Sequence, residues 1–426
     1  MNTQGSERAE VVIAGAGPAG MMLAYLLAIR GIRVRVLERH QDFRREFRGE
    51  GIQPSVMALL EELGFLPYLL ESGIAVRAHR AVIYDEGRPA VTLGGLDDEE
   101  KGDFGLVVFQ EGFLSYLHQR CSAFPNYRLD FGTTVTRPVF EEGRVTALMA
   151  TQRGGEVRVE GNLIVATLGR GSPLRKQVGA EVDVLESAFN IYWLKLDAPA
   201  DPDLVPDGFK AYLGDDALFI FYRSYDGRIQ VAWGKRWNDL SAVRDIDILR
   251  ERLLADVPVP YRAMVAQLNE RTERQFLKVA CDRLRRWHVP GLLFLGDAAH
   301  TMSPVAGQGI NLAIRDSVVA ANHLIAARLA GRPWDEALCQ AIEDERRPEV
   351  EAMQSFQVQL GRLMLGAPRW QRRLVFRYLM PVLNVTGIRR WLVRRVQGGV
   401  TRVAPRYVAP SAWGAFGATP GGPAAP

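Results

Sequence analysis

The sequence predicts a mixed α/β fold in which a mainly antiparallel sheet is inserted into an α/β framework. At the amino terminus, short apolar runs flank a glycine-rich turn and an apolar helix, which is the pattern of a βαβ unit. In the middle of the chain, segments with alternating aromatic residues replace helical spacing, as is typical of a separate sheet. Late in the chain, a short buried strand feeds a long apolar helix and so resumes the α/β pattern.

The amino-terminal unit is expected as strands over 10–14 and 33–38 that flank a helix over 21–30. Further helices are expected over 55–63, 110–122, 246–254, 261–268 and 309–330. Further strands are expected within 76–95, 127–159, 162–167, 189–196, 217–225, 228–233 and 292–295. Gly143 and Gly154 break the segment 127–159 into an antiparallel hairpin set, and the acidic run 97–103 is expected as a solvated loop.

Positive charge is concentrated at the carboxyl terminus. The formal net charge of +4 comes from 53 basic and 49 acidic residues. The last 75 residues contain eleven Arg and no Asp, Glu or Lys, so the rest of the chain has 42 basic against 49 acidic groups, a net of −7. The small net charge of the whole chain therefore combines an acidic body with a basic carboxyl-terminal region.

Several classes of protein are excluded by residue usage. Cys121, Cys281 and Cys339 lie far apart and form no C-x-x-C pair, which excludes a disulfide frame and a cysteine zinc site. The six histidines lack H-x-x-x-H or similar spacing, so no metal site is expected. The uncharged stretch 11–29 contains the glycine-rich turn, which argues against a membrane span or a signal peptide. We therefore expect a soluble, cytoplasmic protein.

The turn Gly15-Ala16-Gly17-Pro18-Ala19-Gly20 fits G-x-G-x-x-G between a strand and a helix. Glycines permit the tight turn and let backbone N–H groups approach a pyrophosphate, while the helix N-terminus supplies partial positive charge. Glu38 ends the second strand eighteen residues beyond Gly20, where a carboxylate accepts hydrogen bonds from a ribose. The pattern predicts dinucleotide binding. The acid favours the unphosphorylated ribose of FAD or NAD, although Arg39 weakens that discrimination.

A second constellation runs from Gly296-Asp297-Ala298-Ala299-His300 through Pro304 and Gly307-Gln308-Gly309 to Asn311. A strand that ends at a flexible turn before a helix with free N–H groups can hold a negatively charged ring oxygen, and Asp297 can bind sugar hydroxyls. The same spacing also fits a plain strand–turn–helix packing unit with an N-capping Asp. Spacing alone leaves both interpretations open.

Together these motifs resemble those of the class A flavoprotein monooxygenases, the para-hydroxybenzoate hydroxylase family, over roughly residues 10 to 400. The resemblance implies that FAD is bound by Gly15, Gly17, Pro18, Ala19, Gly20, Glu38, Arg39, Arg48, Gln110, Gly169, Asp297, Gly307, Gly309, Ile310 and Asn311. It places Pro304 and Gly307 beside the flavin ring. For Arg48 a plain surface charge remains an alternative, and for Gln110 a helix cap.

One position departs from the family pattern. The family's middle motif usually carries an acid before its glycine, whereas this chain reads Thr167-Leu168-Gly169-Arg170. Leucine can neither accept a hydrogen bond nor balance an arginine. Reduction by NADH or NADPH is therefore a weaker expectation than FAD binding, and we hypothesise that Leu168 slows or alters the use of the reductant.

The resemblance implies hydroxylation of an electron-rich aromatic or polyketide- or quinone-like small molecule. Reduced FAD would react with O2 to form a C4a-hydroperoxide that transfers OH to the ring. The mid-chain sheet is expected to form the substrate wall, with Tyr222 and Arg223 as the selected polar contacts among Tyr192, Tyr212, Tyr222, Arg223 and Tyr225. A halogenase is disfavoured because the Trp-x-Trp-x-Ile-Pro string is absent. A flavin dehydrogenase or reductase of a lipid-like substrate and a non-catalytic FAD-binding accessory protein remain alternatives.

The domain boundaries follow from these assignments. A discontinuous FAD-binding domain is expected over 8–75, 102–182 and 275–350, and a substrate domain over 76–101 and 183–274. A basic helical region is expected over 351–405 and a flexible tail over 406–426. The basic region fits a helical cap on the acidic body, or else peripheral contact with a membrane or an acidic carrier protein. We expect no nucleic-acid binding and either a monomer or a homodimer.

Overall fold

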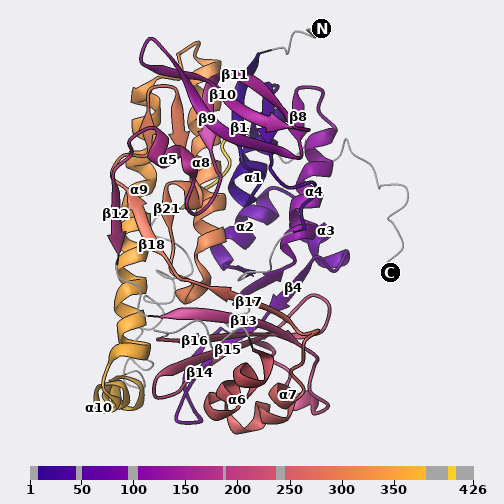
Figure 1. Cartoon of the computed structure of the whole chain (residues 1–426), viewed down its shortest axis with the longest axis vertical. Coiled ribbons are helices and arrows are strands. Elements are labelled where there is room, and N and C mark those ends of the chain that lie inside the picture. The colour runs from indigo at the N-terminus through magenta and orange to yellow at the C-terminus, as the bar shows by residue number, and fades with distance from the viewer. Residues whose placement is uncertain are drawn as a thin grey trace.

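The computed structural model describes residues 8–44, 50–94, 104–185, 189–236, 245–379 and 402–408. Arg48 and the acidic run 97–103 lie outside the described residues. Two sheet-based parts are stacked along the long axis of the molecule, and a long helix runs along one side of both (Figure 1). The predicted class, a nucleotide-binding α/β framework with a second, mainly antiparallel sheet and C-terminal helices, is confirmed.

The framework is built on a sheet whose strand order is β19-β20-β11-β1-β2-β8. Its strands are β1 (Ala9–Ala14), β2 (Val34–Leu37), β8 (Tyr127–Asp130), β11 (Gly155–Ala166), β19 (His288–Val289) and β20 (Leu292–Phe294). β1 pairs in parallel with both β2 and β11, and β11 pairs in parallel with β20. Segments from the beginning, the middle and the later part of the chain therefore lie side by side in this sheet. Val11, Val12 and Ile13 are fully buried, as expected for a central parallel strand.

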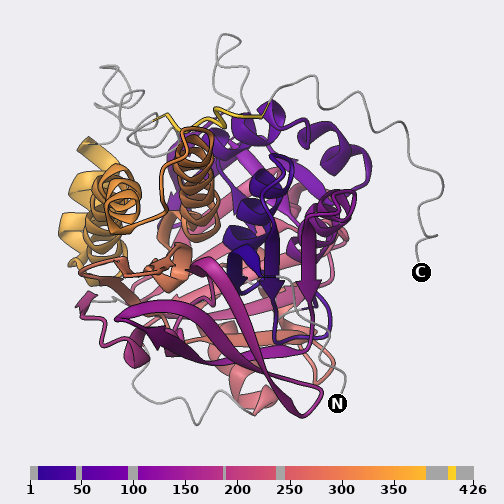
Figure 2. The same ribbon diagram turned by 90° about the horizontal axis from the view of Figure 1, so that it is seen from above.

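Helices cover this sheet and join it to smaller ones. α1 (Pro18–Ala28) packs against α8 (Gly309–Leu329), and both lie beside β1 in the view from above (Figure 2). The other elements of this part are α2 (Pro54–Glu62), α3 (Leu66–Glu71), α4 (Gln110–Ser122), α5 (Pro173–Gln177), β3 (Gly51–Ile52), β4 (Ala75–Ala78), β7 (Gly105–Val108), β12 (Val182–Leu185), β18 (Cys281–Leu284) and β21 (His300–Thr301). The small sheets have the orders β3-β7-β4 and β12-β18-β21.

The predicted hairpin set consists of β9 (Thr133–Glu141), β10 (Arg144–Gln152) and β11. The tight turn between β9 and β10 has φ +49° at Glu142 and +77° at Gly143. A two-residue turn with positive φ at both positions matches the twist of the flanking strands, and glycine adopts such a conformation with least strain. The glycine that the sequence marked as a break therefore closes the hairpin.

The second sheet has the order β17-β13-β16-β15-β14-β5-β6. Its strands are β5 (Arg80–Asp85), β6 (Arg88–Leu93), β13 (Asn190–Leu196), β14 (Gly208–Leu213), β15 (Ala217–Arg223), β16 (Ile229–Lys235) and β17 (Glu273–Leu277). One face packs on α6 (Ile246–Asp256) and α7 (Arg262–Ala266), where Phe219, Phe221 and Trp233 form a buried cluster. The other face turns toward the framework. β5 and β6 join through a parallel pairing with β14, which the sequence pattern did not show.

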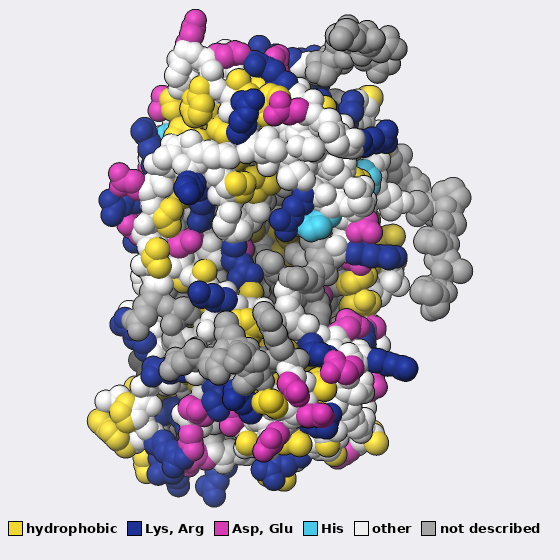
Figure 3. Space-filling view, viewed as in Figure 1, with side chains coloured by type: hydrophobic (Ala, Val, Ile, Leu, Met, Phe, Trp, Pro, Cys, Tyr) yellow, Lys and Arg dark blue, Asp and Glu magenta, His cyan; other side chains and the backbone are white. Residues whose placement is uncertain are grey.

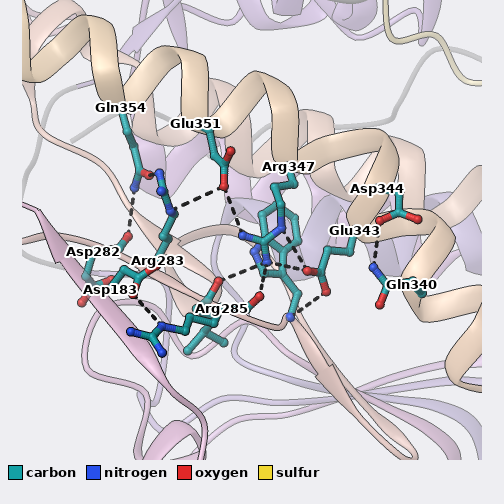
Figure 4. Close-up of polar contacts among 12 residues, drawn as sticks. Asp183, Asp282, Arg283, Arg285, Gln340, Glu343, Asp344, Arg347, Glu351 and Gln354 are labelled. Carbon is teal, nitrogen blue, oxygen red and sulfur yellow. Dashed lines mark hydrogen bonds and ion pairs between the residues drawn. The ribbon is translucent and has the colours of Figure 1, made fainter.

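The helix α9 (Glu336–Gly361) connects the two parts along one side (Figure 1). Side chains from this helix point toward β18 and the segment after it (Figure 4). Gln354 Nε2 donates to the carbonyl of Asp282 at 2.9 Å, and Arg347 Nη2 donates to the carbonyl of Arg285 at 2.7 Å. Because these bonds satisfy main-chain groups of a strand and a loop, α9 is fixed in register against the framework.

Beyond α9 the chain forms a π-helical turn over 362–366, α10 (Arg369–Arg373) and a second π-helical turn over 374–379. Arginines on this segment reach acids in two turns of the second sheet. Arg372 Nε lies 3.1 Å from Asp85 Oδ1, and both side chains are buried. Arg369 pairs with Asp215, and Arg373 pairs with Glu86, in exposed contacts.

The outer side of this segment is apolar. Trp370, Leu374 and Tyr378 are spaced four residues apart and are all exposed, and hydrophobic side chains gather at the corner that α10 occupies (Figure 3). Residues 402–408 lie against the framework, where Asn322 of α8 donates to the carbonyl of Ala404. This segment includes the first residues of the expected tail, and 409–426 lie outside the described residues. None of the described helices is both long and apolar enough to cross a membrane.

Candidate active site

A cavity of about 1250 Å³ lies between the framework and the second sheet. Gly15, Gly17 and Glu38 line one end, and Trp193, Ile220 and Tyr222 line the other. Pockets for a single drug-sized ligand typically have about 300–1000 Å³, so this cavity has room for a dinucleotide and a second molecule. The two ends differ in what forms their walls.

At the first end, the glycine-rich turn packs so closely that side chains do not fit. A Cβ on Gly20 would lie 2.0 Å from the carbonyl oxygen of Gly15, and a Cβ on Gly15 would lie 2.5 Å from the carbonyl oxygen of Thr167. Gly15 also has φ +105°, a conformation that favours glycine. Thr167 Oγ1 donates to the carbonyl of Gly15 at 2.7 Å and so ties β11 to the turn. The turn is a cradle made of backbone, which is what close approach to a pyrophosphate requires.

Glu38 follows β2 and is buried against the same turn. Its Oε2 accepts from the backbone N–H of Ala16 at 2.8 Å, and its Oε1 lies 2.7 Å from His40 Nδ1. The carboxylate also lines the cavity. The residue selected for a ribose therefore reaches the cavity while it braces the glycine-rich turn.

The second motif follows β20, as predicted, and its fold depends on a buried ion network. Asp316 of α8 accepts from the backbone N–H of Gly296 at 3.1 Å, from His300 Nε2 at 2.7 Å and from Arg346 Nε at 2.8 Å. Burial alone would raise the pKa of Asp316, but the interactions with His300 and Arg346 outweigh burial and hold this pKa below its ordinary value. The motif thus positions Asp297, which lines the cavity.

The loop after this motif forms the middle of the cavity wall. Ala306 and Gly307 have φ +59° and lie between the two ends of the cavity. Asn311 Nδ2 donates to the carbonyls of Gly307 at 2.8 Å and of Gly51 at 3.0 Å. Gln53 Nε2 donates to the carbonyl of Ala306 at 2.8 Å. Because the side chains of Gln53 and Asn311 satisfy the loop carbonyls, the loop is held in one conformation.

Gln357 of α9 holds the same loop from the other side. Its Oε1 accepts from the N–H of Ser303 at 3.1 Å, and its Nε2 donates to the carbonyls of Ser303 at 2.8 Å and of Val305 at 2.7 Å. The side chain is fully enclosed. No sequence pattern selected Gln357, because a glutamine on a helix carries no local signal for a contact 54 residues away.

The structure brings most of the selected residues to one cavity. The wall includes Gly15, Gly17, Pro18, Ala19, Glu38, Arg39, Gln110, Leu168, Gly169, Asp297, Pro304, Gly307, Gly309 and Ile310. Gly20 and Asn311 lie behind the wall and support it through packing and hydrogen bonds. Gly169 has φ +78°, and a Cβ there would meet nothing within 4 Å.

At the second end, a row of buried polar side chains crosses from the sheet to β3. Tyr222 Oη donates to Gln230 Oε1 at 2.5 Å, and Gln230 Nε2 donates to Glu50 Oε2 at 2.6 Å. Burial raises the pKa of Glu50 to about 7, against the opposing influence of Lys195 and of the bond from Gln230. Glu50 stands in the motif that supplied Arg48, but the sequence assigned it no role.

The other aromatic and basic candidates of the second sheet lie elsewhere. Successive residues of a strand face opposite sides, so Leu218, Ile220 and Tyr222 line the cavity while Arg223 projects from the helix-covered side and is exposed. Tyr192 and Tyr212 also pack on the helix-covered side. Tyr225 stacks on Phe109, with ring centroids 3.9 Å apart. Of the two selected contacts, the structure places Tyr222 in the wall and Arg223 away from it.

The remaining titratable groups give no sign of metal or thiol chemistry within the part of the chain that the structure describes. No grouping of His, Cys, Asp and Glu among the described residues could hold a metal ion. Cys121, Cys281 and Cys339 are free and buried. The glycine cradle, the acid at the end of β2 and the large cavity together fit FAD.

Comparison with known proteins agrees with this geometry. A family model described as FAD binding domain matches residues 8–357. The 6-methylpretetramide 4-monooxygenase of Streptomyces rimosus is 32% identical over 365 residues, which cover 84% of this chain and 85% of that protein. A 3-(3-hydroxy-phenyl)propionate/3-hydroxycinnamic acid hydroxylase of Escherichia coli is 27% identical over 88% of this chain and 66% of its own length.

Among solved structures, the p-nitrophenol 4-monooxygenase of Pseudomonas putida superimposes with a TM-score of 0.79 over 92% of this chain and 99% of that one. Its sequence identity is 18%, so this likeness bears on the fold. The match to the FAD-binding family and the identity to a named monooxygenase cover most of the chain and agree with the cradle and the cavity. The chain therefore belongs to the class A flavoprotein monooxygenases, the FAD-dependent aromatic hydroxylases related to para-hydroxybenzoate hydroxylase.

Proposed function

We propose that this enzyme hydroxylates an uncharged, electron-rich aromatic molecule of several rings, with FAD, NADH or NADPH, and O2. The observation that carries the proposal is the distribution of charge around the cavity. Among the described wall residues, the basic side chains Arg39, His40 and Arg44 stand at the dinucleotide end, and Arg170 lies with its Nη1 3.5 Å from the carbonyl oxygen of Lys278, just after β17. At the sheet end, the ionisable groups of the described wall are Glu50 and Tyr222.

This distribution separates two kinds of substrate that the relatives' names describe. A carboxylate substrate needs a cationic partner, because an unpaired buried charge is costly. The sheet end offers a carboxyl group instead, within a wall of Trp193, Phe209, Leu218 and Ile220. A phenolic, amide-bearing polyketide of the pretetramide type fits this wall better than a phenylpropionate does.

The length of the apolar wall also favours a substrate of several rings. After the loop at Pro304, the wall continues over Phe356, Leu360, Leu363 and Met364 at the end of α9 and the π-helical turn. Flat ring systems bury a large apolar area, so each added ring gains affinity from such a surface.

Each part of the site has a distinct task in this proposal. The backbone of the glycine-rich turn binds the pyrophosphate, Glu38 and Asp297 bind sugar hydroxyls, and the loop held by Asn311 and Gln357 keeps the flavin ring in place. When bound and reduced, FAD supplies the activation of O2 and the transfer of one oxygen atom. The apolar wall orients the substrate and excludes water from the reacting atoms.

The arginine-rich region fits the cap role within this proposal. Three of its described arginines, Arg369, Arg372 and Arg373, form ion pairs with the second sheet, and Met364 and Phe376 line the cavity. We infer that this region closes the substrate end. Docking on a membrane or an acidic carrier protein stays a prediction for its exposed side.

The test is oxygen incorporation from ¹⁸O2 by the purified holoenzyme, with neutral polycyclic phenols and a phenylpropionate offered in parallel. We expect labelled product, and substrate-stimulated oxidation of NADH or NADPH, with a neutral phenol alone. Product without label would indicate a dehydrogenase or reductase. FAD binding without reduction by either nicotinamide would indicate an accessory protein, and preference for the phenylpropionate would contradict the assigned substrate class.

A further inference from the structure

We propose that Glu50 is the catalytic base that takes the proton from the substrate's phenolic hydroxyl, and that Gln230 and Tyr222 are positioning residues for it. This inference rests on the proposed function, since it needs a phenolic substrate at the sheet end of the cavity. It assigns a reaction step to a carboxyl group that no motif of the sequence selected.

The position of Glu50 is the first support. The residue directly precedes β3, and a Cβ on the neighbouring Gly51 would lie 3.5 Å from the ring of Phe209 in the second sheet. Three residues after Glu50, Gln53 donates to the carbonyl of Ala306 in the loop expected beside the flavin ring. Glu50 therefore stands where the flavin loop meets the substrate wall, and its side chain lines the cavity.

The hydrogen-bond row is the second support. Gln230 lies on the cavity side of β16 and is fully buried. It accepts from Tyr222 Oη through its carbonyl and donates to Glu50 Oε2 through its amide, so the orientation of the amide is fixed by both partners. One carboxylate oxygen is thereby held, and this orients the other for a ligand.

The surrounding charges are the third support. Lys195 of β13 is the buried cation nearest this row, but its Nζ lies 2.7 Å from Asp226 and 4.6 Å from the ring centroid of Tyr225. Among the described groups, Lys195 and the hydrogen bond from Gln230 lower the pKa of Glu50, and Asp226 raises it. The hydroxyls of Tyr222 and Tyr225 also interact with Glu50. With a pKa of about 7, the carboxyl group can change its protonation state near neutral pH.

The step is a proton transfer with no change of oxidation state. The phenolic O–H bond breaks, the proton forms an O–H bond with the Glu50 carboxylate, and the bonding pair stays on the ring oxygen. The resulting phenolate is more electron-rich at the carbons that receive the oxygen atom. The ring carbon later loses its hydrogen as a proton to solvent, the C–H bonding pair stays in the ring, and the ring oxygen takes a proton back from Glu50, which restores the carboxylate.

The first experiment follows the transfer of this proton by absorbance, without catalytic turnover. Alizarin, a hydroxyanthraquinone whose ionised form absorbs at longer wavelength, is titrated into the holoenzyme and into Glu50→Gln between pH 5.5 and 8.5. We expect the bound dye to shift to longer wavelength as Glu50 ionises near pH 7 in the parent enzyme. In Glu50→Gln the shift should be absent until the dye ionises by itself. An identical shift in both proteins would overturn the proposal, even if the enzyme proved not to hydroxylate phenols.

The second experiment uses the pH dependence of kcat with the best phenolic substrate. In the parent enzyme kcat should rise about tenfold from pH 6 to pH 8, as expected for a base with a pKa of about 7. Glu50→Gln should lose this rise and at least 100-fold of kcat at pH 8, with unchanged FAD content. Glu251→Gln removes an exposed carboxylate of α6, on the opposite side of the same sheet, and should leave the profile unchanged.

A third variant covers the case in which Glu50→Gln does not fold. Gln230→Met removes the donor that stabilises the ionised carboxylate, so the rise in kcat should move to higher pH rather than vanish. A profile that stays in place, or moves to lower pH, would contradict the assigned roles.

Thermal stability gives an independent readout. A carboxyl group whose folded pKa is about 7 and whose ordinary value is 4.5 favours the folded state at low pH, and that contribution is lost as pH rises through 7. The melting temperature of Glu50→Gln minus that of the parent enzyme should therefore increase from pH 5 to pH 8.

Discussion

The two ends of the cavity are built on different principles. At the dinucleotide end, the glycine-rich turn presents backbone to the cavity: Gly15 and Gly20 leave no room for a Cβ, and Thr167 ties the carbonyl of Gly15. At the sheet end, the wall is made of side chains such as Trp193 and Ile220, which come from separate strands. A Cβ added to a glycine of the turn should therefore destroy the first end. A change of a single side chain can reshape the second end without loss of the fold.

The largest effect is expected from Gly20→Ala. The new methyl group would lie 2.0 Å from a backbone oxygen, so β1 and α1 would have to separate. We expect protein without FAD, or insoluble protein, measured as the ratio of flavin to protein absorbance after purification. Gly155→Ala is the control, because its Cβ would make only an ordinary contact at 3.7 Å. Full flavin content in Gly20→Ala would show that the glycine-rich turn can accommodate a methyl group at this position and still bind FAD.

The next effect concerns the closure of the sheet end. Arg372→Met removes the guanidinium 3.1 Å from the buried carboxylate of Asp85, and breaking a buried pair typically costs about 3–5 kcal/mol. We expect a clear fall in melting temperature and a higher KM, with FAD still bound. Arg373→Met breaks only an exposed pair and should not change the melting temperature measurably. Equal melting temperatures for the two variants would contradict the cap role.

A change of one side chain in the sheet should affect the substrate and spare the cofactor. Ile220→Trp fills the second end of the cavity, so KM should rise at least tenfold while flavin content stays constant. Arg223 lies on the same strand but faces the opposite side of the sheet, so Arg223→Gln should leave KM within about twofold. A large rise in KM for Arg223→Gln would revive this residue as a substrate contact.

The smallest effect is expected at Leu168, which lines the cavity where the family usually has an acid. Leu168→Asp should change the anaerobic rate of flavin reduction by NADH or NADPH several-fold, because a carboxylate can balance an arginine and accept hydrogen bonds. Stopped-flow absorbance of the flavin measures this rate directly. If the rates with both nicotinamides stay unchanged, the hypothesis about this position is wrong.

The predictability of the site follows the same division. The residues from Gly15 to Gly20 and the motif at Gly296 to Asn311 could be selected because each is a local pattern with a fixed backbone role. Glu50, Gln230 and Gln357 could not, since their partners lie 180 and more than 50 residues away. Tyr222 and Arg223 are adjacent in sequence and looked equivalent, and only the facing of β15 separates them.

By itself, the sequence determined the fold class, the FAD cradle and the uneven distribution of charge. These depend on local hydrophobic periodicity, glycine conformation and composition, which short segments already contain. Only the tertiary structure decided which side of the second sheet faces the cavity, that β5 pairs in parallel with β14, and that Arg369, Arg372 and Arg373 pair with acids in the turns of this sheet. Those features arise from strand pairing and packing between distant segments, so no local pattern of residues can specify them.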